Sequence, residues 1–126
     1  MKAVLDASAL LAFLQDEPGC EDVEAALPDA CISAVNWSEV VQKALAANVD
    51  ISGMRGDIQA LGLTIEAFTE DQAEYAAQLW LDTKKHGLSL ADRACLSLGY
   101  SLGLPILTMD RAWKKPALAL DIKVLR

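Results

Sequence analysis

Four carboxylates stand at positions where they could share a divalent cation. Asp6 and Asp110 each follow a short apolar run, Asp6 directly and Asp110 two residues past 106–108. Glu39 and Asp92 each fall in the first turn of a predicted helix. Clustered carboxylates repel one another, so a fold that gathers them needs a cation. Carboxylate oxygens without thiolate or imidazole favour Mg²⁺ or Mn²⁺ over Zn²⁺, and the chemistry that follows is metal-assisted phosphoryl transfer.

Each of these acids also has an ordinary structural interpretation. Asp6 and Asp110 could be helix N-caps, each contributing about 0.5–2 kcal/mol. Asp92 together with Ser89 has the spacing of a capping box, and Glu39 could complement a helix dipole. The joint pattern is harder to attribute to capping, because an apolar run that ends in a lone Asp occurs twice.

The elements that must position these acids alternate between strand and helix along the chain. This order predicts a parallel sheet with helices on both faces. Ligands bind such a sheet at the carboxyl ends of its strands, where Asp6, Glu39 and Asp110 fall and where Asp92 joins them if its helix begins at the same edge. The predicted strands are 2–5, 31–33, 63–68, 105–108 and 122–125, and the predicted helices are 8–15, 21–27, 36–47, 51–61, 69–86 and 89–102.

Length and composition narrow the class of protein. The chain has 126 residues, of which 53% are hydrophobic, and a net charge of −7. This length fits one compact domain over 1–126. The acidic balance argues against holding nucleic acid by general electrostatics, and the apolar fraction indicates surface reserved for a protein partner. Three cysteines without a C-x-x-C pair favour a reducing, cytoplasmic compartment, and no stretch approaches the length of a membrane span.

The acids occur within four short segments of fixed order and spacing: VLDASALLA at 4–12, NWSEV at 36–40, LSLADRACL at 88–96 and ILTMDRAW at 106–113. Together these segments resemble the PIN-domain family, and specifically the VapC-type toxins of bacterial toxin–antitoxin pairs. The resemblance spans nearly the whole chain, and it is the combination that makes it specific. It implies a Rossmann-like, three-layer α/β/α sandwich with a central, mainly parallel sheet, as a single PIN-like domain.

The resemblance also implies an activity, partners and roles for individual residues. The implied activity is endonucleolytic cleavage of RNA, with a metal-bound water as the attacking group and Mg²⁺ or Mn²⁺ as the cofactor. Related toxins form homodimers and are silenced by a small, VapB-like antitoxin that covers the active-site groove. By this resemblance the metal-binding and catalytic residues are Asp6, Glu39, Asp92 and Asp110, with Ser8 and Thr108 as supporting hydroxyl residues.

Basic residues and an apolar groove are the remaining candidates for contacts. Arg93 and Arg111 directly follow two of the acids, and with Lys84 and Lys85 they could hold RNA phosphates or simply be solvated helix positions. His86 is the only histidine, which excludes a metal-free ribonuclease with two histidines as acid and base. The helices 21–27, 36–47 and 51–61 are predicted to form a groove for an amphipathic segment of the partner.

Two other functions remain open on the residues alone. A phosphoacceptor receiver domain is also a small, acidic, Mg²⁺-binding α/β unit, but it needs paired acids after its first strand, where Asp6 stands alone. The same position excludes a haloacid-dehalogenase-like phosphatase, which needs D-x-D there. A catalytically inactive PIN-like binding module is the second alternative, and the intact set of acids argues against it.

Overall fold

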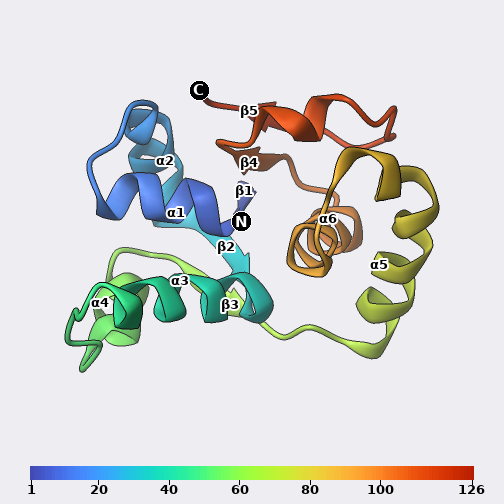
Figure 1. The fold of residues 1–126 in the computed structure, drawn as a ribbon. Helices are drawn as coiled ribbons and strands as arrows, with labels where there is room; N and C mark the ends of the chain where they lie inside the picture. Colours follow the sequence, from blue (N-terminus) through green and yellow to red (C-terminus); the bar gives the residue numbers. More distant parts are fainter.

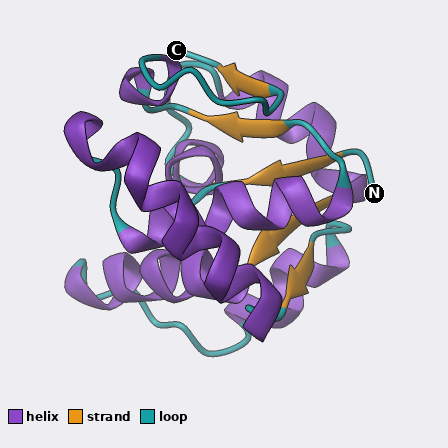
Figure 2. Ribbon diagram, turned by 90° about the vertical axis from the view of Figure 1, so that its right-hand side faces the viewer, coloured by secondary structure: helices purple, strands orange, loops and turns teal.

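The computed structural model describes residues 1–126, and its centre is a sheet of five parallel strands. The strand order is β3-β2-β1-β4-β5, so the chain order reverses beside β1. The strands run in the same sense throughout (Figure 2). A reversal of this kind leaves a crevice at the carboxyl ends of the strands. The strands are β1 (Ala3–Leu5), β2 (Ala30–Ser33), β3 (Thr64–Glu66), β4 (Ile106–Thr108) and β5 (Ile122–Val124).

Helices cover both faces of the sheet and make three layers (Figure 1). One buried cluster joins α1, α2 and α4 to the sheet, and a second joins α5 and α6 to its opposite face. Helix α3 packs against both α1 and α6 and so bridges the two helical layers. The helices are α1 (Ala7–Leu14), α2 (Cys20–Ala26), α3 (Ala34–Ala46), α4 (Met54–Ala60), α5 (Glu70–Thr83) and α6 (Leu90–Leu102), with short 3₁₀ helices at Leu27–Asp29, Lys84–His86 and Arg111–Lys114.

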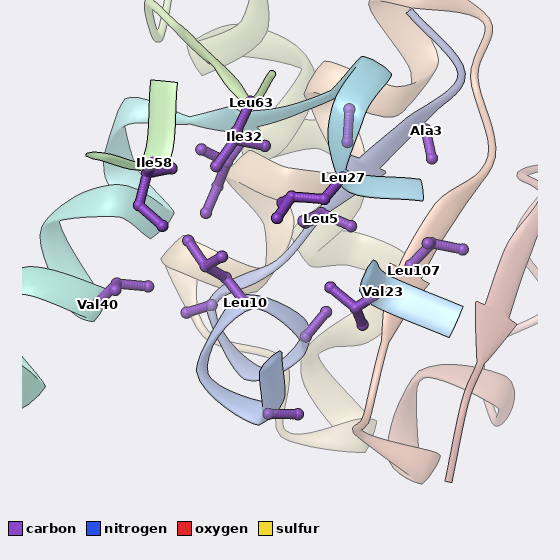
Figure 3. Packing of buried hydrophobic residues seen from close by; sticks show 14 of the residues in the cluster. Ala3, Leu5, Leu10, Val23, Leu27, Ile32, Val40, Ile58, Leu63 and Leu107 are labelled. Atoms are coloured by element: carbon purple, nitrogen blue, oxygen red, sulfur yellow. The ribbon is translucent and has the colours of Figure 1, made fainter. Parts of the chain in front are cut away.

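Alternate residues of the short strands pack into opposite layers. In β1, Leu5 belongs to the cluster under α1 and α2, whereas Val4 belongs to the cluster under α6. Figure 3 shows Leu10 of α1, Val23 of α2 and Ile32 of β2 within the first of these clusters, and none of the three is exposed. Burying a side chain of this size stabilises a fold by about 1.5–3 kcal/mol. This packing holds the strand ends, and with them the loops that follow, in fixed positions.

Serine side chains begin the two helices that carry Glu39 and Asp92. The Ser33 hydroxyl accepts a bond from the Val35 amide at 3.2 Å, so α3 begins directly after β2. Ser89 caps α6, and reciprocal bonds between Ser89 and Asp92 form the predicted capping box. An N-cap of this type contributes about 1 kcal/mol.

The predicted fold class is confirmed, and the mainly parallel sheet is in fact wholly parallel. Helix α3 begins at Ala34, two residues before the predicted start, because Ser33 caps it. The prediction that Glu39 lies in the first turn is therefore wrong: it lies in the second turn, where the helix dipole has little effect.

The three cysteines are buried and free, as the lack of a disulfide framework predicts. None of the helices combines the length and apolar character that a bilayer span requires.

Candidate metal centre

All four predicted acids line one cavity of about 150 Å³ at the carboxyl edge of the sheet. Asp6 follows β1 and Asp110 follows β4, the two strands at which the strand order reverses. Glu39 reaches the cavity from α3 and Asp92 from the first turn of α6. Two of the acids therefore come from strand ends and two from helices, and we call these pairs the strand half and the helix half of the site.

Asp6 is held by hydroxyl groups on both sides of its carboxylate. The Thr108 hydroxyl donates to Oδ2 at 2.6 Å, and the Ser8 hydroxyl lies 2.7 Å from Oδ1 and 2.9 Å from Oδ2. The backbone amide of Ala9 donates to Oδ1 at 2.8 Å, which makes Asp6 the N-cap of α1. Asp6 is only 4% exposed, so these bonds fix its carboxylate in one orientation.

The same hydroxyl groups connect β1 to the segment that carries Asp110. The Thr108 hydroxyl accepts a bond from the Asp110 amide at 3.0 Å, and the Ser8 hydroxyl accepts one from the Met109 amide at 3.0 Å. Asp110 is itself exposed, and its Oδ1 caps the 3₁₀ helix by accepting from the Ala112 amide at 2.9 Å. Ser8 and Thr108, predicted as supporting residues, thus link the two strand-half acids.

The helix half is held by a capping box and by one side-chain amide. Asp92 Oδ2 accepts a bond from the Ser89 amide at 2.9 Å. Glu39 Oε1 accepts one from Asn36 Nδ2 at 3.2 Å, and the same nitrogen donates to the carbonyl of Ala91 at 3.0 Å. Asn36 therefore ties the α3 glutamate to the beginning of α6.

Burial makes this site unfavourable for negative charge. Desolvation of Asp6 is the largest cause that raises its pKa, to about 6, against the lowering effect of its hydrogen bonds; the charge of Asp92 raises the pKa further. Desolvation also raises the pKa of Asp92, and the nearby charge of Asp110 adds to that rise. The two halves of the site are thus electrostatically coupled, and a cation among them would relieve the repulsion.

Capping and metal binding are compatible in this arrangement. Asp6, Asp92 and Asp110 all cap helical turns, as the structural interpretation predicts, yet all three also line the cavity. No three His, Cys, Asp or Glu side chains lie close enough to form a complete ion cage. Mg²⁺ does not require one, because it keeps several waters and binds through one or two carboxylates plus substrate phosphates. The donor chemistry of the cavity therefore fits a hard divalent cation.

None of the basic residues predicted to contact RNA lines the cavity. Arg93 points away from it, and its Nη1 donates to the Ala76 carbonyl of α5 at 2.8 Å. Arg111 Nε donates to the carbonyl of Arg126 at 3.1 Å, and Lys84 lies over the ring of Trp80 at 4.7 Å from its centre. Lys85 is exposed.

Lys43 is the one basic residue that lines the cavity, and sequence reasoning did not single it out. It follows Glu39 by four residues on α3, which places both side chains on one helix face. That spacing was the available signal. Lys43 makes no ion pair with any of the acids, so its ammonium group is free to meet an anion that enters the cavity.

A larger apolar groove of about 350 Å³ adjoins the cavity, and Leu11 and Lys43 line both. Its walls are α1, α3, α4 and the segment between α3 and α4. The prediction that 21–27 helps to form this groove is wrong, since no residue of α2 lines it. Val23 of α2 is fully buried in the core, and the groove wall that was expected from α2 is formed by α1 through Leu11 and Leu14.

Solved structures share this fold over most or all of the chain. A toxin–antitoxin complex from Klebsiella pneumoniae has a TM-score of 0.74 at 20% identity, with 99% of this chain and 98% of that chain covered. A DNA-bound VapBC from Salmonella typhimurium has a TM-score of 0.76 at 18% identity, with 100% and 99% covered. VapC20 from Mycobacterium tuberculosis, a sarcin-ricin loop cleaving toxin, has a TM-score of 0.72 at 15% identity, with 90% and 93% covered.

Comparisons by sequence give the family. None of the curated proteins matches the chain. The family model described as PIN domain matches residues 3–118, a range that includes all four cavity acids together with Ser8 and Thr108. The strand order β3-β2-β1-β4-β5 also differs from the 2-1-3-4-5 order of receiver-like folds, so it agrees with this match in deciding against the receiver-like alternative. The chain belongs to the PIN domain family.

Proposed function

We propose that the protein is a Mg²⁺- or Mn²⁺-dependent endoribonuclease and the toxin of a toxin–antitoxin pair. The observation that carries this proposal is the convergence of Asp6, Glu39, Asp92 and Asp110 on one cavity. The acids come from four separate segments of the chain, and capping alone gives no reason for them to meet. Among the structural neighbours, VapC20 is described as a toxin that cleaves the sarcin-ricin loop, which is RNA.

The acids would hold the ion, and the hydroxyl residues would hold the acids. A bound ion supplies charge neutralisation and an activated water for attack on a phosphodiester. Ser8 and Thr108 keep the Asp6 carboxylate aimed by bonds of 2.6–2.9 Å. Lys43 offers the cavity its one ammonium group, which is suited to a phosphate of the RNA backbone.

Cleavage of labelled RNA by the purified protein tests this proposal. We expect cutting with Mg²⁺ or Mn²⁺ and none with chelator. Asp6→Asn should lose nearly all cleavage, whereas Asp82→Asn, which changes an exposed acid of α5 outside the cavity, should keep it. Cutting that persists in chelator would contradict the metal dependence. A folded protein that binds Mn²⁺ but cuts no RNA would instead be the inactive PIN-like binding module.

The antitoxin would occupy the apolar groove beside the cavity. Several structural neighbours are toxin–antitoxin complexes, and the groove is continuous with the acid site through Leu11 and Lys43. We propose an amphipathic segment of a VapB-like antitoxin whose apolar face lies in the groove and whose basic side chain reaches the acids. The chain's net charge of −7 favours such a basic group.

Expression with and without the neighbouring gene tests this partner. The protein alone should arrest bacterial growth, and the product of the adjacent gene should relieve the arrest. Ala47→Arg, at an exposed position of the groove wall, should weaken antitoxin binding at least tenfold and leave RNA cleavage intact. Ala117→Arg, exposed and outside the groove, is the matched control. Equal antitoxin binding by the two variants would place the partner elsewhere.

Homodimer formation and a cytoplasmic location are part of the same proposal. Large apolar side chains of α5 and α6 are exposed, including Leu81 at 67% and Tyr100 at 58%, and such surface suits a contact between copies. Light scattering on the purified protein measures the assembly. A mass of one chain at micromolar concentration would contradict the dimer.

A further inference from the structure

Asn36 is a buried polar residue outside the predicted set of acids and supporting hydroxyl residues. It lies in the first turn of α3, is completely buried, and uses one nitrogen to contact both Glu39 and the α6 backbone at Ala91. Ala91 directly precedes Asp92, so this nitrogen connects Glu39 to the turn of α6 that carries Asp92. No other side-chain hydrogen bond connects α3 to α6.

The orientation of the Asn36 amide follows from its partners. Both atoms near Nδ2 are acceptors: a Glu39 carboxylate oxygen at 3.2 Å and the Ala91 carbonyl at 3.0 Å. Exchanging the amide oxygen and nitrogen would set oxygen against oxygen at both contacts, so only the observed orientation is favourable. Two acceptors held by a single amide group bring α3 and α6 to a defined separation.

The other end of the amide gives the fold no compensating hydrogen bond. Asn36 Oδ1 is buried without a hydrogen-bond partner. An unsatisfied buried acceptor costs about 1–3 kcal/mol, and an apolar side chain of similar shape would avoid that cost. A buried polar group retained at such a cost calls for a specific explanation, and its contact with Glu39 supplies one.

We propose that Asn36 is a positioning residue that sets the Glu39 carboxylate and its spacing from Asp92 for metal binding. Glu39 needs such help because its side chain has more rotatable bonds than an aspartate and is held by no hydroxyl group. The inference rests on the proposed metal-dependent function. Residues that orient metal ligands typically change metal affinity by about 10–100-fold when removed.

Titration with Mn²⁺, followed by the electron paramagnetic resonance of the free ion, tests the proposal on the full chain. Asn36→Ala should raise the Mn²⁺ dissociation constant about tenfold. The matched control is Gln72→Ala, which removes another buried side-chain amide with an unpaired oxygen, on α5 and outside the cavity. That control should lower the melting temperature in chelator but leave Mn²⁺ affinity unchanged. Asn36→Ser keeps one hydrogen-bond donor on a shorter side chain and provides a second variant, for which we expect an intermediate effect.

A double-mutant cycle separates positioning from general loosening of the fold. If Asn36 acts through Glu39, adding Asn36→Ala to Glu39→Gln should change the dissociation constant by less than about twofold. A full tenfold effect in that background would overturn the proposal, as would wild-type affinity in both Asn36 variants. Wild-type protein that binds no Mn²⁺ at millimolar concentration would overturn the proposed function as well, so the two failures are distinguishable.

Discussion

The strand half and the helix half of the acid cavity are built in different ways. Asp6 is almost fully buried and is surrounded by two hydroxyl groups and a backbone amide. Its backbone is also tied to the sheet, since the Asp6 amide donates to the Leu107 carbonyl of β4 at 3.2 Å. Glu39 and Asp92 are half-buried, and a single amide of Asn36 bridges their helices.

The difference shows where rigidity in this site originates. The parallel ladder between β1 and β4 fixes the strand half, because its hydrogen bonds belong to the sheet that the whole core supports. The helix half depends on how α3 packs against α6. We infer that the sheet anchors the strand half and that the geometry of the helix half relies on the single Asn36 bridge.

The largest expected effect comes from neutralising the most enclosed acid. Asp6→Asn should reduce RNA cleavage by about a thousandfold or more, the scale at which loss of a preorganised electrostatic group acts. In chelator the same variant should melt at or above the wild-type temperature, because it removes a buried charge and keeps the Ala9 cap. Mg²⁺ should reverse the order, since ligand binding stabilises the wild type more. Calorimetry in both buffers provides the measurement, and a wild type that melts equally with chelator, Mg²⁺ and Mn²⁺ would contradict the metal site.

The metal-free protein should lose stability as the pH rises through the range in which Asp6 ionises. The pKa of Asp6 is about 6 in the folded state against 3.8 for an ordinary aspartate, so the folded state binds the proton more tightly. The contribution of Asp6 to the free energy of unfolding is fully present below about pH 4. It falls by roughly 3 kcal/mol in total as the pH rises past 6. Urea unfolding in chelator at pH 4.5 and 7.5 should show about two-thirds of this loss in the wild type, because the unfolded-state carboxyl is already mostly ionised at pH 4.5. In Asp6→Asn this part of the pH-dependent loss of stability should be absent. Identical pH profiles for the two proteins would refute the burial argument.

Removing the hydroxyl that connects the strand-half acids should have a smaller effect. Thr108→Val leaves Asp6 without its shortest bond and the Asp110 amide without an acceptor, which should lower stability by about 1–3 kcal/mol and weaken cleavage. Thr83→Val is the matched control, since Thr83 is equally buried but bonds only within its own helix, to the Leu79 carbonyl. Comparable loss of cleavage in both variants would show that the hydroxyl acts through general stability.

The smallest predicted effect concerns Lys43. Lys43→Gln should weaken RNA binding several-fold, similarly for different RNA sequences, and should reduce the slope of log K against log salt by about 0.7. Lys114→Gln changes an exposed lysine away from the cavity and should leave binding and slope unchanged. Filter binding in chelator, where cleavage is blocked, gives both constants. An unchanged slope for Lys43→Gln would remove this residue from the phosphate contacts.

The strand half could be predicted from sequence more fully than the helix half. An apolar run followed by Asp places Asp6 and Asp110 at the same edge of a parallel sheet, and the pairing of β1 with β4 then brings them together. The sequence pattern predicts the wrong turn for Glu39, because Ser33 ends β2 and also caps α3. The direction of Arg93 and the bridge made by Asn36 depend on how α6 packs against α5 and α3. No local spacing encodes such tertiary contacts.

The use of acids as helix caps has a consequence for how the sequence can change over evolutionary time. Asp6, Asp92 and Asp110 serve the fold as well as the cavity, so a descendant released from selection for cleavage would still be selected for a capping group at each position. Asn and Ser satisfy that requirement. Glu39 caps nothing and is half-buried, so it is free to drift. Decay of activity in a lineage of this fold should therefore be recorded first at position 39, while positions 6 and 110 retain short polar side chains.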